Sequence, residues 1–249
     1  MNALAVAGSS LYVGGGFTTY RGVAASRLAI VDLTTGNLDS VFSGGMGANN
    51  TIFVLAVSGS SVFAGGSLVA YRGTPAQFLA KVNLSTGELD TTFTQTTGLD
   101  SGVSALAIAG SSLYVGGGFT TYRGVAAQRL AKVDLITGAL DTTFTQSTGP
   151  DSSVSALAVA GSSLYVGGSF STYRGVAAQR LAKVDLTTGA LDTTFTQSTG
   201  ANSTVSALAV VGSSLYLGGS FTTYRGSGFL NISPYATVLG LTSGDDIGF

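Results

Sequence analysis

The chain has 249 residues, with 11 lysines and arginines against 12 aspartates and glutamates, and only 9% of its residues are charged, where roughly 25% is usual for soluble domains. Because there is no basic field, the composition excludes an electrostatic grip on nucleic acid or anionic lipid. Cysteine and histidine are both absent, so the sequence offers no disulfide framework, thiolate zinc site, thiol nucleophile or histidine base.

Serine, threonine, glycine, asparagine and glutamine supply the polar surface, which suits extracellular proteins that work at variable salt. Mean hydropathy is +0.43, yet Ser and Gly pairs interrupt every apolar stretch well short of the ~18 residues that a spanning helix needs. We therefore predict no membrane insertion. Residues 1–6 already align with residues 154–159 of a later copy, so no signal peptide is visible in this chain, and this does not argue against secretion.

One phrase recurs along the whole chain at a step of 51 residues. Its aromatic residue stands at Tyr12, Phe63, Tyr114, Tyr165 and Tyr216. A fixed step without slippage indicates one supersecondary unit that is copied and stacked, each copy completing the core of its neighbour. We predict a single repeat domain over residues 1–249, with units 1–51, 52–102, 103–153 and 154–204 and a divergent last unit 205–249.

The fourth unit, residues 154–204, reads as four strands in chain order. Residues 154–160 are apolar or small on both faces, as in a covered strand, and Gly161-Ser162 predicts a two-residue hairpin of type II′. Residues 164–168 form the second strand, whose paired glycines predict a bulge or a close backbone approach.

The third strand is expected around residues 179–186, followed by a short turn at residues 187–189. Residues 191–195 alternate apolar and polar and predict an outer, half-exposed fourth strand. No stretch shows helical periodicity, so the class is all-β. Short turns then share one rim, while the longer loops 171–178 and 196–204 share the opposite rim, where binding usually occurs.

The fifth unit keeps residues 215–219 and 224–226 and then departs at residues 228–235, and its residues 241–244 echo residues 186–189 with a displacement of four. Terminal units of repeat arrays are often atypical. Four-stranded units of this length predict a β-propeller of about five blades, and five copies would make a small closed ring. A linear β-solenoid is the alternative, which its usually shorter periods and these two-residue hairpins disfavour.

The phrases at residues 113–119, Gly124, residues 129–131 and residues 137–144 resemble the bacterial delta-60 repeat, a β-propeller-type repeat. The match covers units one to four in full. This resemblance implies a part of a large secreted or surface protein of bacteria, with display or adhesion as its role. The last residues, 244–249, depart from the phrase Gly-x-Leu-Asp-x-x-Phe, which leaves the last strand of the fifth unit open.

A Tyr-Arg-Gly triplet recurs in every unit and gives the candidate binding residues. These are Tyr20, Arg21, Tyr71, Arg72, Tyr122, Arg123, Tyr173, Arg174, Tyr224 and Arg225. Tyrosine can stack on a sugar, and a guanidinium can bind a carboxylate, sulfate or phosphate. The alternative is structural: each arginine pairs with a carboxylate of its own or the next blade, and each tyrosine packs between blades.

Aspartates follow each glycine turn, at Asp39, Asp90, Asp141 and Asp192. They are expected to accept backbone N–H bonds and fix the turn. The alternative is calcium, with co-ligands seven positions earlier at Asp32, Asn83, Asp134 and Asp185, but each unit offers few of the six to eight oxygens required. We predict no metal and no cofactor.

A glycosidase needs two carboxylates about 5–10 Å apart, and Asp245-Asp246 is the one adjacent pair in the sequence. We therefore predict a non-enzymatic, secreted or cell-surface propeller module for multivalent binding or adhesion, with a glycan or protein as its partner. The alternative is a purely structural block of an extracellular fibre or large assembly, with copies of itself as partners. A glycoside hydrolase is the third and least supported reading.

Overall fold

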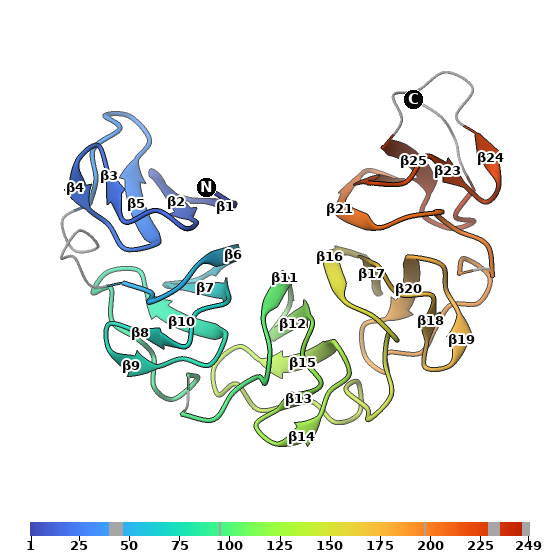
Figure 1. The fold of residues 1–249 in the computed structure, drawn as a ribbon, viewed down its shortest axis with the longest axis horizontal. Helices are drawn as coiled ribbons and strands as arrows, with labels where there is room; N and C mark the ends of the chain where they lie inside the picture. The colour runs from blue at the N-terminus through green and yellow to red at the C-terminus, as the bar shows by residue number, and fades with distance from the viewer. Residues whose placement is uncertain (40–46, 95, 197, 229–234, 246–249) are drawn as a thin grey trace.

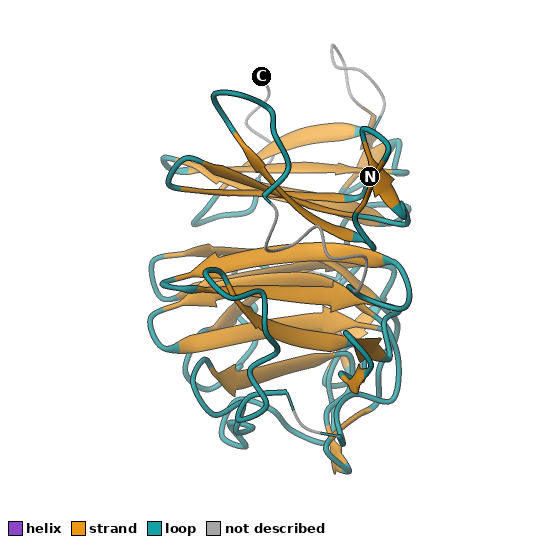
Figure 2. Ribbon diagram, turned by 90° about the vertical axis from the view of Figure 1, so that its left-hand side faces the viewer, coloured by secondary structure: helices purple, strands orange, loops and turns teal. Residues whose placement is uncertain are grey.

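The computed structural model describes residues 1–39, 47–94, 96–196, 198–228 and 235–245. They form an all-β array of five similar blades arranged in an arc, with the N-terminal and C-terminal blades facing each other across a gap (Figure 1). Seen from the side, the strands of successive blades lie in layers with loops at both rims, and no described residue is helical (Figure 2). The described part of the chain thus contains no helix that could cross a bilayer.

Each blade contains a three-stranded antiparallel sheet in which the second strand lies in the middle. The first strands, which lie nearest the centre of the arc in Figure 1, are β1 (Ala3–Ala7), β6 (Ile52–Ser58), β11 (Val103–Ala109), β16 (Val154–Ala160) and β21 (Val205–Val211). The second strands are β2 (Ser10–Gly14), β7 (Ser61–Gly66), β12 (Ser112–Gly117), β17 (Ser163–Gly168) and β22 (Ser214–Gly219). The third strands are β5 (Leu28–Asp32), β10 (Leu79–Asn83), β15 (Leu130–Asp134), β20 (Leu181–Asp185) and β25 (Ala236–Gly240).

A small two-stranded hairpin connects the second and third strands of each blade at the periphery of the arc (Figure 1). These hairpins are β3 (Thr19–Tyr20) with β4 (Val23–Ala24), β8 (Ala70–Tyr71) with β9 (Thr74–Pro75), β13 (Thr121–Tyr122) with β14 (Val125–Ala126), β18 (Thr172–Tyr173) with β19 (Val176–Ala177), and β23 (Thr223–Tyr224) with β24 (Ser227–Gly228). The sequence predicted only a long loop over residues 171–178.

The predicted turn and bulge are confirmed in the fourth unit. Ala160 pairs with Ser163 across Gly161-Ser162, and Gly161 has a φ of 55°, as the first residue of a type II′ turn requires. The register shifts between Val154 and Ala156 opposite the glycine pair. A Cβ on Gly168 would lie 2.2 Å from the carbonyl oxygen of Ser153, so the close backbone approach requires glycine here.

The predicted fourth strand, residues 191–195, is shortened to one antiparallel bridge between Val184 and Leu191. Its chain leaves the sheet because Asp192 accepts the backbone N–H groups of Thr194 and Phe195 and closes a tight turn. The same bridge recurs at Val31–Leu38, Val82–Leu89 and Val133–Leu140. The displaced echo in the fifth unit is confirmed, since β25 pairs with β22 in the register of the other blades, whereas residues 229–234 and 246–249 lie outside the described residues.

The hydrophobic core is divided into clusters that lie between neighbouring blades. Between the third and fourth blades, for example, Tyr114, Leu130 and Phe144 of one blade pack with Leu164 and Val166 of the next. Each blade is therefore stabilised mainly by its neighbours, as a stacked repeat predicts. The five units make an open arc, so the small closed ring expected for five copies is not found in the described part of the chain (Figure 1).

Candidate functional site

The Tyr-Arg-Gly triplets lie at the tips of the five peripheral hairpins (Figure 1). In the third blade Tyr122 pairs with Val125 across a two-residue turn. The turn residues Arg123 and Gly124 have φ values of 49° and 78°. Positive φ at both central residues is the mark of the type I′ turn, whose twist matches a two-stranded hairpin. The glycine of each triplet thus explains a hairpin at a place where the sequence predicts a loop.

The tyrosines of the triplets are built into the molecule. Tyr71, Tyr122, Tyr173 and Tyr224 are at most 4% exposed, and the Tyr122 hydroxyl donates to the carbonyl oxygen of Gly138 at 2.7 Å. Burial raises the pKa of Tyr71, Tyr122 and Tyr173 to about 12, against the opposing charge of the adjacent arginine. Because these four rings are buried, they have no open face on which a ligand could stack. They agree instead with the structural alternative, in which each tyrosine packs between blades.

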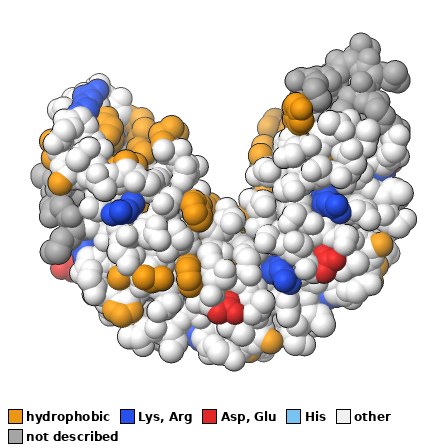
Figure 3. All heavy atoms as spheres, viewed as in Figure 1, with side chains coloured by type: hydrophobic (Ala, Val, Ile, Leu, Met, Phe, Trp, Pro, Cys, Tyr) orange, Lys and Arg blue, Asp and Glu red, His pale blue; other side chains and the backbone are white. Residues whose placement is uncertain are grey.

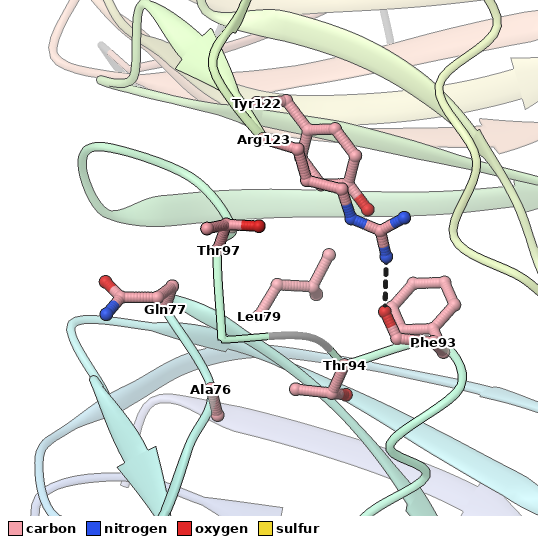
Figure 4. Close-up of a pocket in the computed structure, with 9 residues that line it drawn as sticks. Ala76, Gln77, Leu79, Phe93, Thr94, Thr97, Tyr122 and Arg123 are labelled. Atoms are coloured by element: carbon pink, nitrogen blue, oxygen red, sulfur yellow. Dashed lines mark hydrogen bonds between the residues drawn. The ribbon is translucent and has the colours of Figure 1, made fainter.

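In the third, fourth and fifth blades, the arginine of the triplet joins its blade to the one before it. Arg123 Nη2 donates to the carbonyl oxygen of Phe93 at 2.6 Å, as Figure 4 shows, and Arg174 Nη2 does the same to Phe144 at 2.6 Å. Arg225 reaches Phe195 at 2.8 Å and also pairs with Asp245 at 2.7 Å.

The structural alternative expected a carboxylate for each arginine. For Arg123 and Arg174 the described partners are carbonyl oxygens instead, because the turn that ends each blade leaves the phenylalanine carbonyl available to the guanidinium fork. Each guanidinium also lies over its neighbouring tyrosine ring, at 5.1 Å for Arg123 and 5.3 Å for Arg174. The cavity beside Arg123 in Figure 4 measures about 10 Å³, room for one water molecule.

Arg123→Ala is expected to destabilise the chain by about 1–3 kcal/mol, because it removes a charge-assisted hydrogen bond to a carbonyl that is then left without that donor. Arg21→Ala is the matched control. Arg21 has a φ of 46° against 49° for Arg123, so the backbone strain is equal, but Arg21 lies in the first described blade and has no described blade in front of it. Thermal unfolding of both variants checks this: equal losses would contradict a role in joining blades.

Three lysines that were not among the predicted site residues form ion pairs with the turn aspartates. Lys81 pairs with Asp90 at 2.8 Å, and the same pair recurs as Lys132–Asp141 and Lys183–Asp192, each at 2.9 Å. Each ammonium lies beside an edge-to-face aromatic pair, such as Tyr114 and Phe144, whose ring centroids are 5.3 Å apart. The signal was present in the sequence as a lysine nine positions before each aspartate.

Asp90, Asp141 and Asp192 fix their turns as predicted, since each accepts two backbone N–H bonds. The proposed co-ligands are used locally as well. Asp134 Oδ1 accepts the N–H groups of Ile136 and Thr137 and the Thr137 hydroxyl, at 2.8–3.0 Å. These bonds, the backbone one from Thr137 above all, hold the pKa of Asp134 below its usual value. Within the described ranges, no three acidic side chains gather as a metal site.

Asp134→Asn is expected to leave stability within about 0.5 kcal/mol of the wild type, whereas Asp134→Ala should cost about 0.5–2 kcal/mol, the range for losing a side-chain cap. The second blade supplies the reason, because Asn83 Oδ1 accepts the N–H groups of Ser85 and Thr86 at 2.9 and 3.0 Å in the same turn. Thermal midpoints in buffers with and without calcium check it. A calcium-dependent midpoint in the wild type alone would favour the metal interpretation instead.

Of the adjacent carboxylates considered for glycoside hydrolysis, Asp245 pairs with Arg225, and Asp246 lies outside the described residues. A pocket of about 310 Å³ lies on the opposite rim, between the second and third blades, lined by Ser58, Ser60, Lys81 and Leu135 among others. It occurs where Phe63 replaces the tyrosine of other blades: Tyr114 donates to the Leu186 carbonyl at 2.7 Å, and phenylalanine has no hydroxyl to do so.

Comparison with known proteins agrees with this architecture. The family model described as Domain of unknown function (DUF5122) beta-propeller matches residues 112–144 and 163–195. These segments run from the second strand to the turn phenylalanine of the third and fourth units. No curated protein is significantly similar to the chain.

Two solved structures share the fold over 99% of the chain. One is the computationally designed Ika8 protein, with a TM-score of 0.62 and 18% identity, and the chain spans 60% of its length. The other is the WD40 beta propeller domain of Doa1, with a TM-score of 0.61 and 13% identity, of which the chain spans 66%. The family match and these two folds together identify the chain as a β-propeller-type repeat protein.

Proposed function

We propose that the chain is a non-enzymatic, secreted or cell-surface interaction module that binds a glycan or protein through several weak, equivalent contacts. The observation that carries this proposal is the repeated surface at the hairpin tips. Val23, Val125 and Val176 are 50%, 49% and 48% exposed at the same position of three blades, each two residues after the triplet arginine.

The tips are held rigidly, which favours binding. In the third blade the buried Tyr122 and the bond from Arg123 to the preceding blade fix the hairpin on both sides, so little conformational freedom is lost when a ligand binds. Rigid, equivalent sites along an arc add through effective concentration, so that weak single contacts give a tight whole. The low charge and the resemblance of the units to the bacterial delta-60 repeat support the extracellular location.

The test is binding of the purified full chain to a glycan array and to a panel of immobilised extracellular proteins. The variant combines Val23→Thr, Val125→Thr and Val176→Thr, because threonine is the natural residue at this position of the second blade, Thr74. We expect the triple variant to lose at least tenfold in apparent affinity, single variants to lose less, and all midpoints of unfolding to stay unchanged. Affinity that is unaffected in the triple variant would refute the hairpin tips as the binding surface.

The second candidate is a purely structural block of an extracellular fibre or assembly. The gap between the first and fifth blades is here called the notch. Uncovered apolar surface on both of its walls favours this second candidate (Figure 3). Sedimentation of the chain over a range of concentrations separates the two functions. An ordered polymer at low micromolar concentration supports the structural block, and a monomer that binds an arrayed ligand supports the interaction module.

A further inference from the structure

The four interfaces between neighbouring blades are built from one repeated set of residues. In the cluster between the first and second blades, the second blade contributes Val62, Ala64, Leu68, Tyr71, Ala80 and Val82. The third and fourth blades place the residues 51 and 102 positions later in the next two clusters. This face of a blade, here called the leading face, therefore packs against the preceding blade wherever one is present.

The first blade has the same leading face, with nothing described in front of it. Its residues Leu11, Val13, Phe17, Tyr20, Ala29 and Val31 pack only against their own blade. All of these except Ala29 line an apolar hollow of about 340 Å³ together with Met1 and Leu4. Leu4 is 51% exposed, whereas its equivalent Leu55 in the second blade is 9% exposed. Figure 3 shows hydrophobic side chains gathered on this wall of the notch.

The opposite face of a blade is here called the trailing face. A glycine in its second strand leaves space for a side chain of the next blade, and this space is here called the glycine socket. A Cβ on Gly65 would lie 2.5 Å from Val103 Cγ1 of the next blade, and on Gly116 it would lie 2.5 Å from Val154 Cγ1. The glycine is needed because the first strand of the next blade inserts a branched side chain against the bare backbone. Gly14 and Gly167 receive Ile52 and Val205 in the same way.

The fifth blade has this socket, and it is unfilled by the described residues. A Cβ on Gly218 would meet only Ala207 Cβ at 3.6 Å and the Tyr235 carbonyl oxygen at 3.9 Å. Around it, Ala207 and Ala209 are exposed and Val211 is 64% exposed. An apolar hollow of about 270 Å³ covers Tyr216, Leu217 and Gly218.

We propose that these two end faces are docking surfaces for two or three further copies of the same 51-residue unit, which close the ring. The leading face of the first blade and the trailing face of the fifth are the two halves of an interface that the molecule forms four times internally. A further unit therefore fits both faces. Its own glycine socket would receive Met1 of the first blade, and a branched side chain of its first strand would fill the socket at Gly218.

The number of units follows from the size of the propellers that share the fold. Five blades span 60% and 66% of those chains, which corresponds to about seven or eight blades in a ring. A second copy of the whole chain brings five blades, too many for the notch. Because each interface fixes the angle between blades, such a copy would engage one end only and leave the assembly open.

The test uses a single thiol, since the chain contains no cysteine. Leu4→Cys is placed in the full chain and in chains with one, two or three extra copies of residues 154–204 inserted after residue 204. Reaction with a maleimide is followed for each length. We expect fast labelling with five blades and labelling at least tenfold slower with seven or eight, because the ends then meet and bury position 4.

Two controls accompany each length. Val125→Cys, at an exposed hairpin tip, should label fast throughout, and Leu55→Cys, inside an existing interface, should label slowly in every correctly folded array. Gly218→Val should restore fast labelling of Leu4→Cys in the closing array, because the socket is filled. Fast labelling of Leu4→Cys at all lengths overturns the proposal. Labelling of the five-blade chain that becomes slower as its concentration rises also overturns it, because the end faces would then bind a second copy of the chain.

Discussion

Gly116→Ala is expected to lower the midpoint of thermal unfolding by about 3–10 °C, from an overpacking cost of about 1–3 kcal/mol. The new methyl group would lie 2.5 Å from Val154 Cγ1 and 3.1 Å from Val154 Cβ. Val154 is fully buried, and because its side chain is β-branched, rotation about χ1 is restricted and cannot move it out of the way. The two blades must move apart, and the cluster between them loses contacts on both sides.

Gly218→Ala is the matched control, with an expected change of the opposite sign. It stands at the same position of the fifth blade, where the methyl group has contacts no shorter than 3.6 Å. Alanine restricts the unfolded chain more than glycine does, which stabilises the folded state by about 0.4–1 kcal/mol at an unstrained position. Thermal scans of the two variants check both. An equal loss at Gly116 and Gly218 would mean that the glycines serve the sheet itself and not the next blade.

The architecture could be predicted from the sequence because the information is local and repeated. The step of 51 residues, the Gly161-Ser162 turn and the glycine pair at Gly167 and Gly168 each predict a feature that the structure contains. The length of the fourth strand could not be predicted, because residues 191–195 alternate as a strand does. The hydrogen bonds from Asp192 to the following N–H groups compete with the sheet and end it after one bridge.

The candidate site was harder to predict, because its contacts connect different units. A triplet such as Tyr122-Arg123-Gly124 is compatible with an exposed rim or a buried joint, and only the position of Phe93 in the preceding blade distinguishes the two. Whether the five units close into a ring could not be predicted from the sequence either. Five copies suggest a ring, but the angle between blades is set by side chains such as Val154 in the socket of Gly116, and this angle leaves an open arc (Figure 1).

Asp141→Asn is expected to destabilise the chain by about 1–3 kcal/mol at neutral pH, towards the lower end because the Asp141 side chain is 32% exposed. The loss arises from Lys132, whose side chain is only 13% exposed and would keep its charge without a carboxylate partner. The nearby rings of Tyr114 and Phe144, whose centroids are 6.0 Å from Nζ, replace only part of that attraction. The amide oxygen of asparagine still accepts the turn N–H bonds, so the variant isolates the charge.

The first blade supplies a natural control, because Ile30 stands where the second, third and fourth blades have lysine. Lys132→Ile combined with Asp141→Asn should therefore be more stable than Asp141→Asn alone, since no unpaired ammonium is left in the interface. If the double variant instead loses as much stability as Lys132→Ile and Asp141→Asn lose separately when added together, the two residues are not coupled. The short distance between them would then not contribute to stability.

Acid unfolding gives an independent measurement of the same pair. Burial alone would raise the pKa of Asp141, but the bonds from Lys132, Phe144 and Thr143 outweigh it and hold the pKa below 3.8. A carboxyl with a lowered folded pKa contributes stability above its unfolded pKa and loses it as the pH falls through the folded value. The wild type should thus exceed Asp141→Asn in midpoint at pH 7, and the difference should shrink progressively below about pH 4. Asp90→Asn and Asp192→Asn should behave alike, because in both carboxyls the bonds from the paired lysine and the turn N–H groups outweigh burial and keep the pKa low. If the wild type and the variants still differ in midpoint at low pH, the aspartates act through the shape of the turn and not through their charge.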